Sequence, residues 1–276
     1  MNKLTKIGLS ALAGSLVAFS AHAGSLSASG KASITFSNGD DKSLTHEGNQ
    51  WTMGDSITMT GSGEMDNGMT ISVSFEIDND DTGGGNVYDS HSMTLDTNGM
   101  GTITFAGHGG SSAMSALDDV TPNAYQESWD VVTGAETSTL VGGHSGDNMF
   151  TYKSPDLSGA TITVAYLNAS DAGTDVSYTD YSIVAKPEMV EGLEIGYGFG
   201  ETEETTGTAI DESAMYVKYT YGSVTVGYQI NEADGPAAAN DLDFEALGIS
   251  YAVTDDFTIG YSTSESDLAS DSDVQE

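Results

Sequence analysis

Apolar and polar residues alternate along most of this chain, with a period of two residues over segments of roughly ten residues. In one segment Met69, Ile71, Val73 and Phe75 lie on one face, and threonine, serine and glutamate occupy the other. This alternation predicts antiparallel β-strands that carry one apolar and one polar face. About thirteen such segments follow Gly24, so we predict an all-β protein.

The connections between these segments alternate between long and short. "GDDKSLTHEGN" and "ETEETTGTAIDE" are long, whereas "EMDNG" and "YGS" are short. Tight turns at one end and long charged loops at the other are typical of barrels in the bacterial outer membrane. A soluble sandwich also has alternating strands, but its packing does not require this order of connections. We therefore predict a transmembrane antiparallel β-barrel whose polar face lines a water-filled lumen.

One stretch, at about residues 107–147, interrupts the alternation. Its first part, "GHGGSSAMSALDDVTPNAYQESWD", contains small residues, two aromatic residues and four carboxylates, and has no strand or helix period. Irregular backbone at membrane depth is tolerated where water in a lumen solvates it. We predict that this loop folds into the lumen and that its acids form a cation-attracting constriction; the alternative is ordinary solvated acids in an acidic chain. The predicted constriction residues are Asp118, Asp119, Glu127 and Asp130.

Acids and histidines of the loops suggest metal binding as a second possibility. Loop carboxylates are the usual ligands of calcium, so we name Asp118 and Asp119 as a possible calcium site, although no EF-hand pattern is present. His108 and His144 flank the long loop, each beside glycine. A metal site there needs a third ligand, and the alternative is that these histidines anchor the loop by hydrogen bonds.

The first residues have the pattern of a secretory signal peptide. Lys3 and Lys6 precede the apolar run "IGLSALAGSLVAFS", and "AHA" follows as a small-x-small cleavage site. We predict cleavage after Ala23, which leaves residues 24–276 as one barrel domain that is exported to the outer membrane. A short N-terminal anchor is the alternative.

The amino-acid composition excludes several classes of function. The formal net charge is −35 at pH 7, all seven basic residues are lysines, and there is no cysteine. A chain this acidic will not bind nucleic acid, and it concentrates cations near its surface. Thiolate metal sites and disulfides are excluded. The sequence has no G-x-S-x-G or H-E-x-x-H motif, so we do not expect an enzyme.

Several stretches resemble general porins of Gram-negative bacteria, of the alphaproteobacterial, Rhodobacter-like type. "LSASGKASITFSNGDD" resembles their first strand and "WTMGDSITMTGSGEMDNGMTISVSFEIDND" their second and third. "SHSMTLDTNGMGTITFAGHGG" resembles the fourth and fifth strands, and "TYKSPDLSGATITVAYLN" the segment after the pore loop. The resemblance covers most of residues 24–264. It implies a sixteen-stranded, homotrimeric barrel whose third long loop narrows the lumen.

The sequence departs from the family's pattern in its basic residues. Porins of this family usually place arginines on the wall that faces the acidic loop, and this chain has none. Lys31, Lys153 and Lys218 fall on polar phases of their strands, and they are the lumen-wall cations that we nominate. A strong transverse field across the pore is therefore not expected.

Two further departures concern the C-terminus and one carboxylate. "SESDLASDSDVQE" has an acidic loop composition without a strand pattern, so we expect a truncated barrel that lacks about three strands, or else a smaller barrel. Asp55 falls on the lipid phase with Met53 and Ile57, where a charge is unfavourable. Either a bulge shifts the phase there, or that face meets another subunit.

We conclude that the sequence predicts an outer-membrane general diffusion porin. It would pass small hydrophilic solutes and ions passively, prefer cations, contact outer-membrane lipid and require no cofactor. The alternative is a structural or adhesive β protein of the cell surface whose acidic loops bind calcium.

Overall fold

The computed structural model describes residues 25–39, 48–78, 88–118, 120–123, 143–168, 177–203, 209–235, 241–255, 257–268 and 274–275. Within these ranges thirteen strands have five residues or more, in agreement with the count predicted from the alternation. No helix in the described ranges has the length and hydropathy needed to cross a membrane. The elements are β1 (Ser25–Gly39), β2 (Gly48–Glu64), β3 (Thr70–Asp78), β4 (Ser90–Asp96), β5 (Thr102–His108), β6 (Gly110–Ser111), the 3₁₀ helix η2 (Met114–Ala116), β7 (Ser145–Gly146), β8 (Met149–Lys153), β9 (Ala160–Leu167), β10 (Ser177–Ala185), β11 (Leu193–Glu203), β12 (Ala209–Tyr221), β13 (Val224–Asp234), β14 (Leu242–Thr254), β15 (Phe257–Leu268) and β16 (Val274–Gln275).

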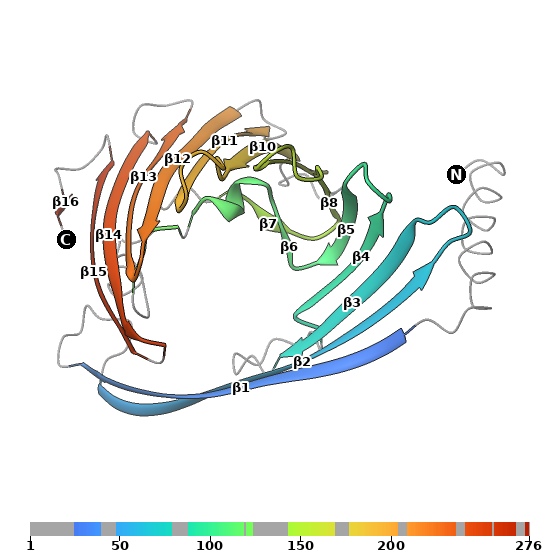
Figure 1. The fold of residues 1–276 in the computed structure, drawn as a ribbon, viewed down its shortest axis with the longest axis horizontal. Coiled ribbons are helices and arrows are strands. Elements are labelled where there is room, and N and C mark those ends of the chain that lie inside the picture. The colour runs from blue at the N-terminus through green and yellow to red at the C-terminus, as the bar shows by residue number, and fades with distance from the viewer. Residues whose placement is uncertain are drawn as a thin grey trace.

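Fourteen strands form one antiparallel sheet in chain order, in which β5 pairs directly with β8. The two strands between them, β6 and β7, pair with each other apart from this sheet. Figure 1 shows that the sheet curves around a hollow interior, into which β6, η2 and β7 project. The short connections favour hairpin pairing of the strands that they join. The all-β, porin-like barrel architecture predicted from the sequence is confirmed.

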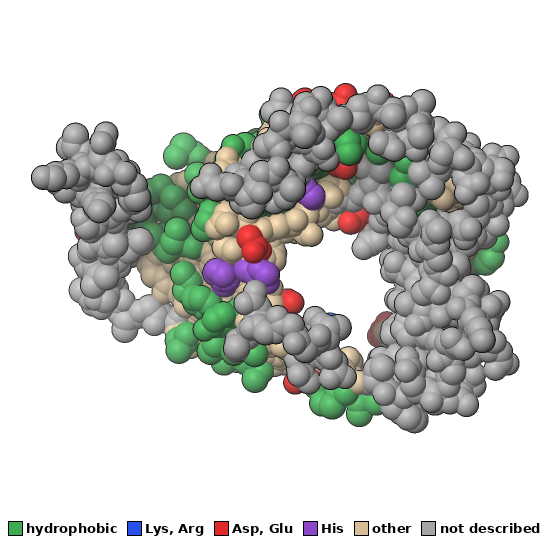
Figure 2. All heavy atoms as spheres, turned by 180° about the vertical axis from the view of Figure 1, so that it is seen from behind, with side chains coloured by type: hydrophobic (Ala, Val, Ile, Leu, Met, Phe, Trp, Pro, Cys, Tyr) green, Lys and Arg blue, Asp and Glu red, His purple; other side chains and the backbone are tan. Residues whose placement is uncertain are grey.

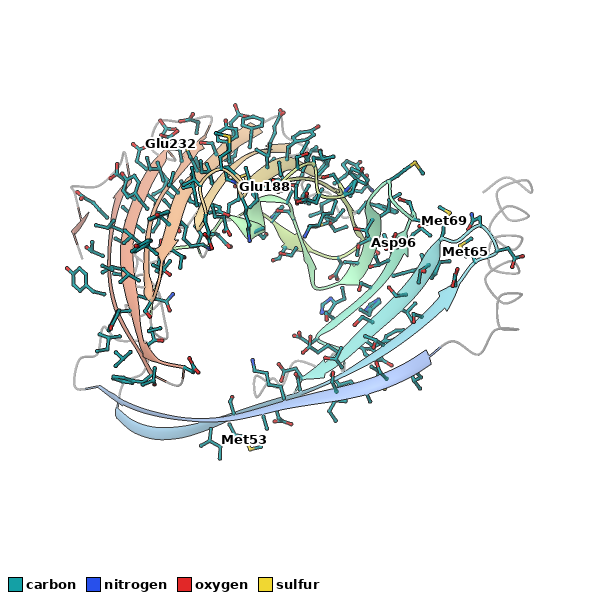
Figure 3. The ribbon with its side chains drawn as sticks, in the orientation of Figure 1. Met53, Met65, Met69, Asp96, Glu188 and Glu232 are labelled. Atoms are coloured by element: carbon teal, nitrogen blue, oxygen red, sulfur yellow. The ribbon has the colours of Figure 1, made fainter. Side chains whose placement is uncertain are left out.

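The two faces of the sheet differ as the alternation predicts. Ile34 is 72% exposed and Met53 64%, and both lie on the same face because they are cross-strand partners. Figure 3 shows Met53 pointing away from the hollow interior. Figure 2 shows hydrophobic side chains on the outer side and an open passage bordered by acidic, histidine and uncharged polar groups. Lipid accounts for exposed apolar side chains on an outer face.

One expectation about the C-terminal region is wrong. We expected no strand in "SESDLASDSDVQE", but β15 continues to Leu268 and pairs with β14, and β16 pairs with Glu265 and Ser266. The end of β15 is polar on both faces, so its sequence has no contrast that would mark a strand. The backbone hydrogen bonds supplied by β14 extend it nevertheless.

The register around Asp55 excludes one of the two explanations for its position. Asp55 pairs with Ala32, and the ladders of β2 with both neighbours run without a register shift. A bulge therefore does not move Asp55 off the apolar face. Its carboxylate stays on the face that carries Met53 and Ile57.

Candidate functional site

The long loop leaves and rejoins the wall as a short two-stranded ribbon. Beyond the β6–β7 ladder, the backbone N–H of Ser112 donates to the carbonyl of His144 (3.0 Å), and the His144 N–H donates to Ser112 Oγ (3.0 Å). His108 Nδ1 lies 2.7 Å from Asp147 Oδ1 across the base of the ribbon. The predicted absence of any regular structure between 107 and 147 is therefore wrong at the base of the loop, because local pairing of glycine and serine has no hydrophobic signature.

The histidines at the loop base have different partners. His108 bonds to Asp147, whereas the His144 ring packs edge-on against Tyr178 at a centroid distance of 5.1 Å. Burial lowers the pKa of His144, and the nearby Asp180 carboxylate acts in the opposite direction. Within the described residues, no three His, Cys, Asp or Glu side chains are arranged to hold a metal ion.

Asp180 on β10 anchors the start of η2. Its carboxylate is fully buried and accepts hydrogen bonds from the backbone N–H groups of Met114 (2.7 Å) and Ala113 (3.0 Å). The first N–H groups of a helix have no partners within the helix, so a carboxylate there satisfies them and is charge-assisted. The anchor therefore holds the loop against the inner wall.

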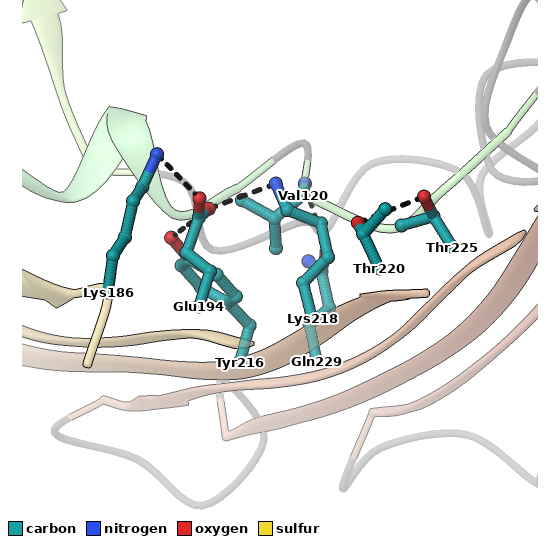
Figure 4. Close-up of polar contacts among 8 residues, drawn as sticks. All are labelled: Val120, Lys186, Glu194, Tyr216, Lys218, Thr220, Thr225 and Gln229. Atoms are coloured by element: carbon teal, nitrogen blue, oxygen red, sulfur yellow. Dashed lines mark hydrogen bonds and ion pairs between the residues drawn. The ribbon is translucent and has the colours of Figure 1, made fainter. Parts of the chain in front are cut away.

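Gln229 on β13 forms a second anchor farther along the loop. Its side chain is fully buried, accepts from Thr121 Oγ1 (2.8 Å) and donates to the Asp118 carbonyl (2.6 Å). The Val120 N–H also points to Gln229 Oε1, at 3.4 Å (Figure 4). Asn231 accepts the Gln229 amide (3.0 Å) and orients it.

Glycines on the inner face of the wall let the loop lie close to it. A Cβ at Gly198 would lie 2.4 Å from Leu117 Cδ1, and one at Gly248 would lie 2.3 Å from the Pro122 carbonyl. Met114 and Leu117 are buried there against Tyr216 and its neighbours. Glycine in a strand marks a close approach by another backbone. The repeated glycines of "EIGYGFG" were a signal for this contact that the sequence analysis did not use.

The predicted constriction acids are placed only in part. Asp118 lies in the described loop, where its carbonyl bonds to Gln229. Asp119, Glu127 and Asp130 lie outside the described residues. The constriction and the possible calcium site at Asp118 and Asp119 therefore stay predictions.

The nominated wall cations have different surroundings. Lys218 Nζ lies 2.9 Å from Glu194 Oε1, and Lys186 Nζ lies 2.8 Å from Glu194 Oε2 (Figure 4). The Tyr216 hydroxyl donates to the same carboxylate at 2.8 Å. Glu194 thus offsets one of the two positive charges of Lys186 and Lys218. Neither Glu194 nor Lys186 was among the residues predicted from the sequence. The ion pair between Glu194 and Lys218 could have been predicted by aligning the two neighbouring strands, since these residues are direct cross-strand partners.

Lys31 and Lys153 are the other two nominated cations. Both residues are exposed. Lys31 lies on the opposite face of β1 from Ile34, and Lys153 on the opposite face of β8 from the exposed Tyr152.

Comparison with known proteins agrees with this architecture. Residues 8–276 match a family described as Gram-negative porin. A comparison with curated proteins gave no match. A loop-deletion mutant of OmpT, an outer membrane protein of Vibrio cholerae, superposes with a TM-score of 0.64 at 16% identity, covering 91% of this chain and 85% of its own. The fold is shared by an anion-selective porin from Comamonas acidovorans, with a TM-score of 0.61 at 13% identity, covering 89% of this chain and 79% of its own. It is also shared by Salmonella typhi OmpF in complex with daunomycin, with a TM-score of 0.61 at 15% identity, covering 87% of this chain and 78% of its own.

Proposed function

Because this chain belongs to the Gram-negative porin family, we propose that it is a general diffusion porin that passes small hydrophilic solutes and ions and prefers cations. The observation that carries the proposal is that Asp180 and Gln229 bind the first part of the loop, at Met114 and Thr121, to the inner wall. A segment held in this way narrows a lumen without closing it. Processing after Ala23 belongs to the same proposal, although residues 1–23 lie outside the described part of the chain.

The charge distribution supports the cation preference. The chain has a formal charge of −35 and no arginine, and Glu194 offsets one of the two positive charges of Lys186 and Lys218. An acidic lumen raises the local concentration of cations and excludes anions. The fold alone does not set the preference for cations, since an anion-selective porin has the same fold at 13% identity.

Planar-bilayer recording tests the proposal. We expect stepwise conductance and, in a KCl gradient, a reversal potential displaced towards that of potassium. Neutralising the four constriction acids should move the reversal potential towards zero, because these acids would no longer gather cations. The variant carries Asp118→Asn, Asp119→Asn, Glu127→Gln and Asp130→Asn.

A matched control removes four charges from strand phases that face outward. It should leave the reversal potential unchanged, and an equal shift in both variants would reject the constriction assignment. A protein that conducts at no voltage would reject the pore itself and favour the structural or adhesive alternative. The control variant carries Glu201→Gln, Asp211→Asn, Asp234→Asn and Asp243→Asn.

We also propose that the chain assembles as a homotrimer through the outer face of β1 and β2. This face carries Asp55 in an unbroken apolar phase, and a carboxylate is unfavourable against lipid but not against a polar subunit contact. Asp55→Leu should lower the dissociation temperature of the oligomer by roughly 3–10 °C, because polar groups on the neighbouring subunit lose their partner. Unheated gel electrophoresis measures this, with Ile57→Leu on the same face as control. A more stable oligomer in Asp55→Leu would place Asp55 in lipid.

A further inference from the structure

The inner face of β3, β4, β5 and β8 carries hydroxyl side chains in register. Ser72 pairs with Thr94, Thr94 with Thr104, and Thr104 with Thr151. A second row pairs Ser74 with Ser92. Direct cross-strand partners lie on one face, so these side chains form a continuous surface. We call it the hydroxyl wall and define it as Ser72, Ser74, Ser92, Thr94, Thr104 and Thr151.

The hydroxyl wall faces the interior. Its residues alternate with Met93, Ile103 and Phe150, which are exposed on the outer face. Met93 belongs to the same face as Met53, through the unbroken cross-strand pairs of β2, β3 and β4, and Figure 3 shows Met53 pointing outward. The hydroxyl groups must therefore point the other way.

The hydroxyl wall is accessible, whereas the wall beneath the anchored part of the loop is not. All six hydroxyl-wall residues are partly exposed. In contrast, Asp180, Gln229 and Asn231 are fully buried beneath the loop. The described loop anchors lie on β10 and β13, and the start of the loop packs against Met149 of β8, one inward-facing position beyond Thr151. A solute in the passage can therefore touch the hydroxyl groups.

The chemistry of this wall suits neutral solutes with many hydroxyl groups. Each Ser or Thr hydroxyl donates one hydrogen bond, accepts two, and rotates to suit its partner. Thr94 Oγ1 and Thr104 Oγ1 bond to each other at 2.9 Å, which leaves further acceptor capacity on both. Neighbouring groups lie roughly 5 Å apart across strands and roughly 7 Å apart along them. A solute that loses bound water in a narrow passage can replace the lost hydrogen bonds with hydrogen bonds to these hydroxyl groups as it moves along the wall.

We propose that the hydroxyl wall is the surface that favours passage of neutral polyhydroxylated solutes, of the class of pentoses and hexoses, over neutral solutes of equal size without hydroxyl groups. This inference rests on the proposed pore. The six residues carry no charge, so the preference is independent of the cation selectivity assigned to the loop. A hydroxyl group also does not hold a sugar tightly, which agrees with diffusion rather than binding.

Osmotic swelling of proteoliposomes tests the inference. The rates for a hexose and for an oligoethylene glycol dimethyl ether of similar mass are compared, and their ratio is the readout. Removing four hydroxyl groups should lower the hexose-to-ether ratio by about threefold to tenfold, which corresponds to the loss of about one net hydrogen bond of about 1 kcal/mol. Potassium conductance should stay unchanged. The variant carries Ser72→Ala, Thr94→Val, Thr104→Val and Thr151→Val.

Thr220→Val with Thr225→Val is the matched control. These hydroxyls also form a cross-strand pair, at 3.1 Å, but on β12 and β13 (Figure 4). The ratio should not change in this control. If the fourfold variant does not assemble, Thr94→Val with Thr104→Val provides a smaller change, because valine suits a strand as well as threonine.

The outcomes separate the two proposals. An unchanged hexose-to-ether ratio in a conducting variant would overturn the inference and leave the pore intact. An equal fall in the control would also overturn it, because the effect would not belong to the hydroxyl wall. Absence of swelling and conductance in the unmodified protein would instead reject the pore.

Discussion

Replacing Asp180 with alanine should detach the start of the pore loop from the wall and raise the open-channel noise, because a loop without this anchor fluctuates within the passage. The substitution removes two hydrogen bonds to a buried carboxylate and leaves the N–H groups of Ala113 and Met114 without a partner. This should cost roughly 2–3 kcal/mol, which raises the detached population by roughly two orders of magnitude. Single-channel recording measures the effect directly.

Two controls make this expectation specific. Asp180→Asn keeps an acceptor oxygen at the same place and should have a smaller effect. Asp211→Asn removes a charge from an exposed position on β12 and should have none. Equal effects from Asp180→Ala and Asp211→Asn would show that charge, and not the attachment of the loop, controls the open-channel noise.

Replacing Gly198 with valine should lower the mean conductance, because it displaces the loop from the wall to a fixed position within the passage. A Cβ at this position would lie 2.4 Å from Leu117 Cδ1 and 3.0 Å from Met114 Cγ, so the loop must move off the wall and into the passage. Overpacking of this kind costs about 1–3 kcal/mol. Lower conductance together with normal heat-modifiable mobility on a gel would identify a displaced loop in a folded protein.

The chain provides a matched control and a rescue for this substitution. A Cβ at Gly63 on β2 meets nothing within 4 Å, so Gly63→Val should leave the conductance unchanged. Adding Leu117→Ala to Gly198→Val removes the side chain in conflict and should restore most of the conductance. Failure of this rescue would contradict the assignment of Leu117 as the contact.

The strands were predicted correctly from the sequence where their signal is carried by neighbouring residues. Alternation such as that of Val73 and Phe75 with Ser72 and Ser74 predicted the strands and their faces, because side chains on a strand point to opposite sides in turn. It failed at the end of β15, where both faces are polar and only pairing with β14 makes the strand.

The contacts that hold the loop were not predicted, although their residues lie in predicted strands. Asp180 and Gln229 appeared as ordinary polar residues on a lumen-facing phase. Their partners are 66 and 108 residues away in sequence, at Met114 and Thr121. No local pattern specifies which of many inward-facing polar residues a distant loop will contact.

Charge and periodicity are properties of the sequence by itself. They determined that the protein is an acidic, all-β membrane barrel with a polar interior and one long irregular loop. Only the tertiary structure decided that the described first part of this loop lies along β10 to β14, that Lys218 shares Glu194 with Lys186, and that the hydroxyl wall is partly exposed. The physical reason is that periodicity follows from the geometry of adjacent residues, whereas packing of a loop depends on the curvature of the sheet, which brings distant strands together.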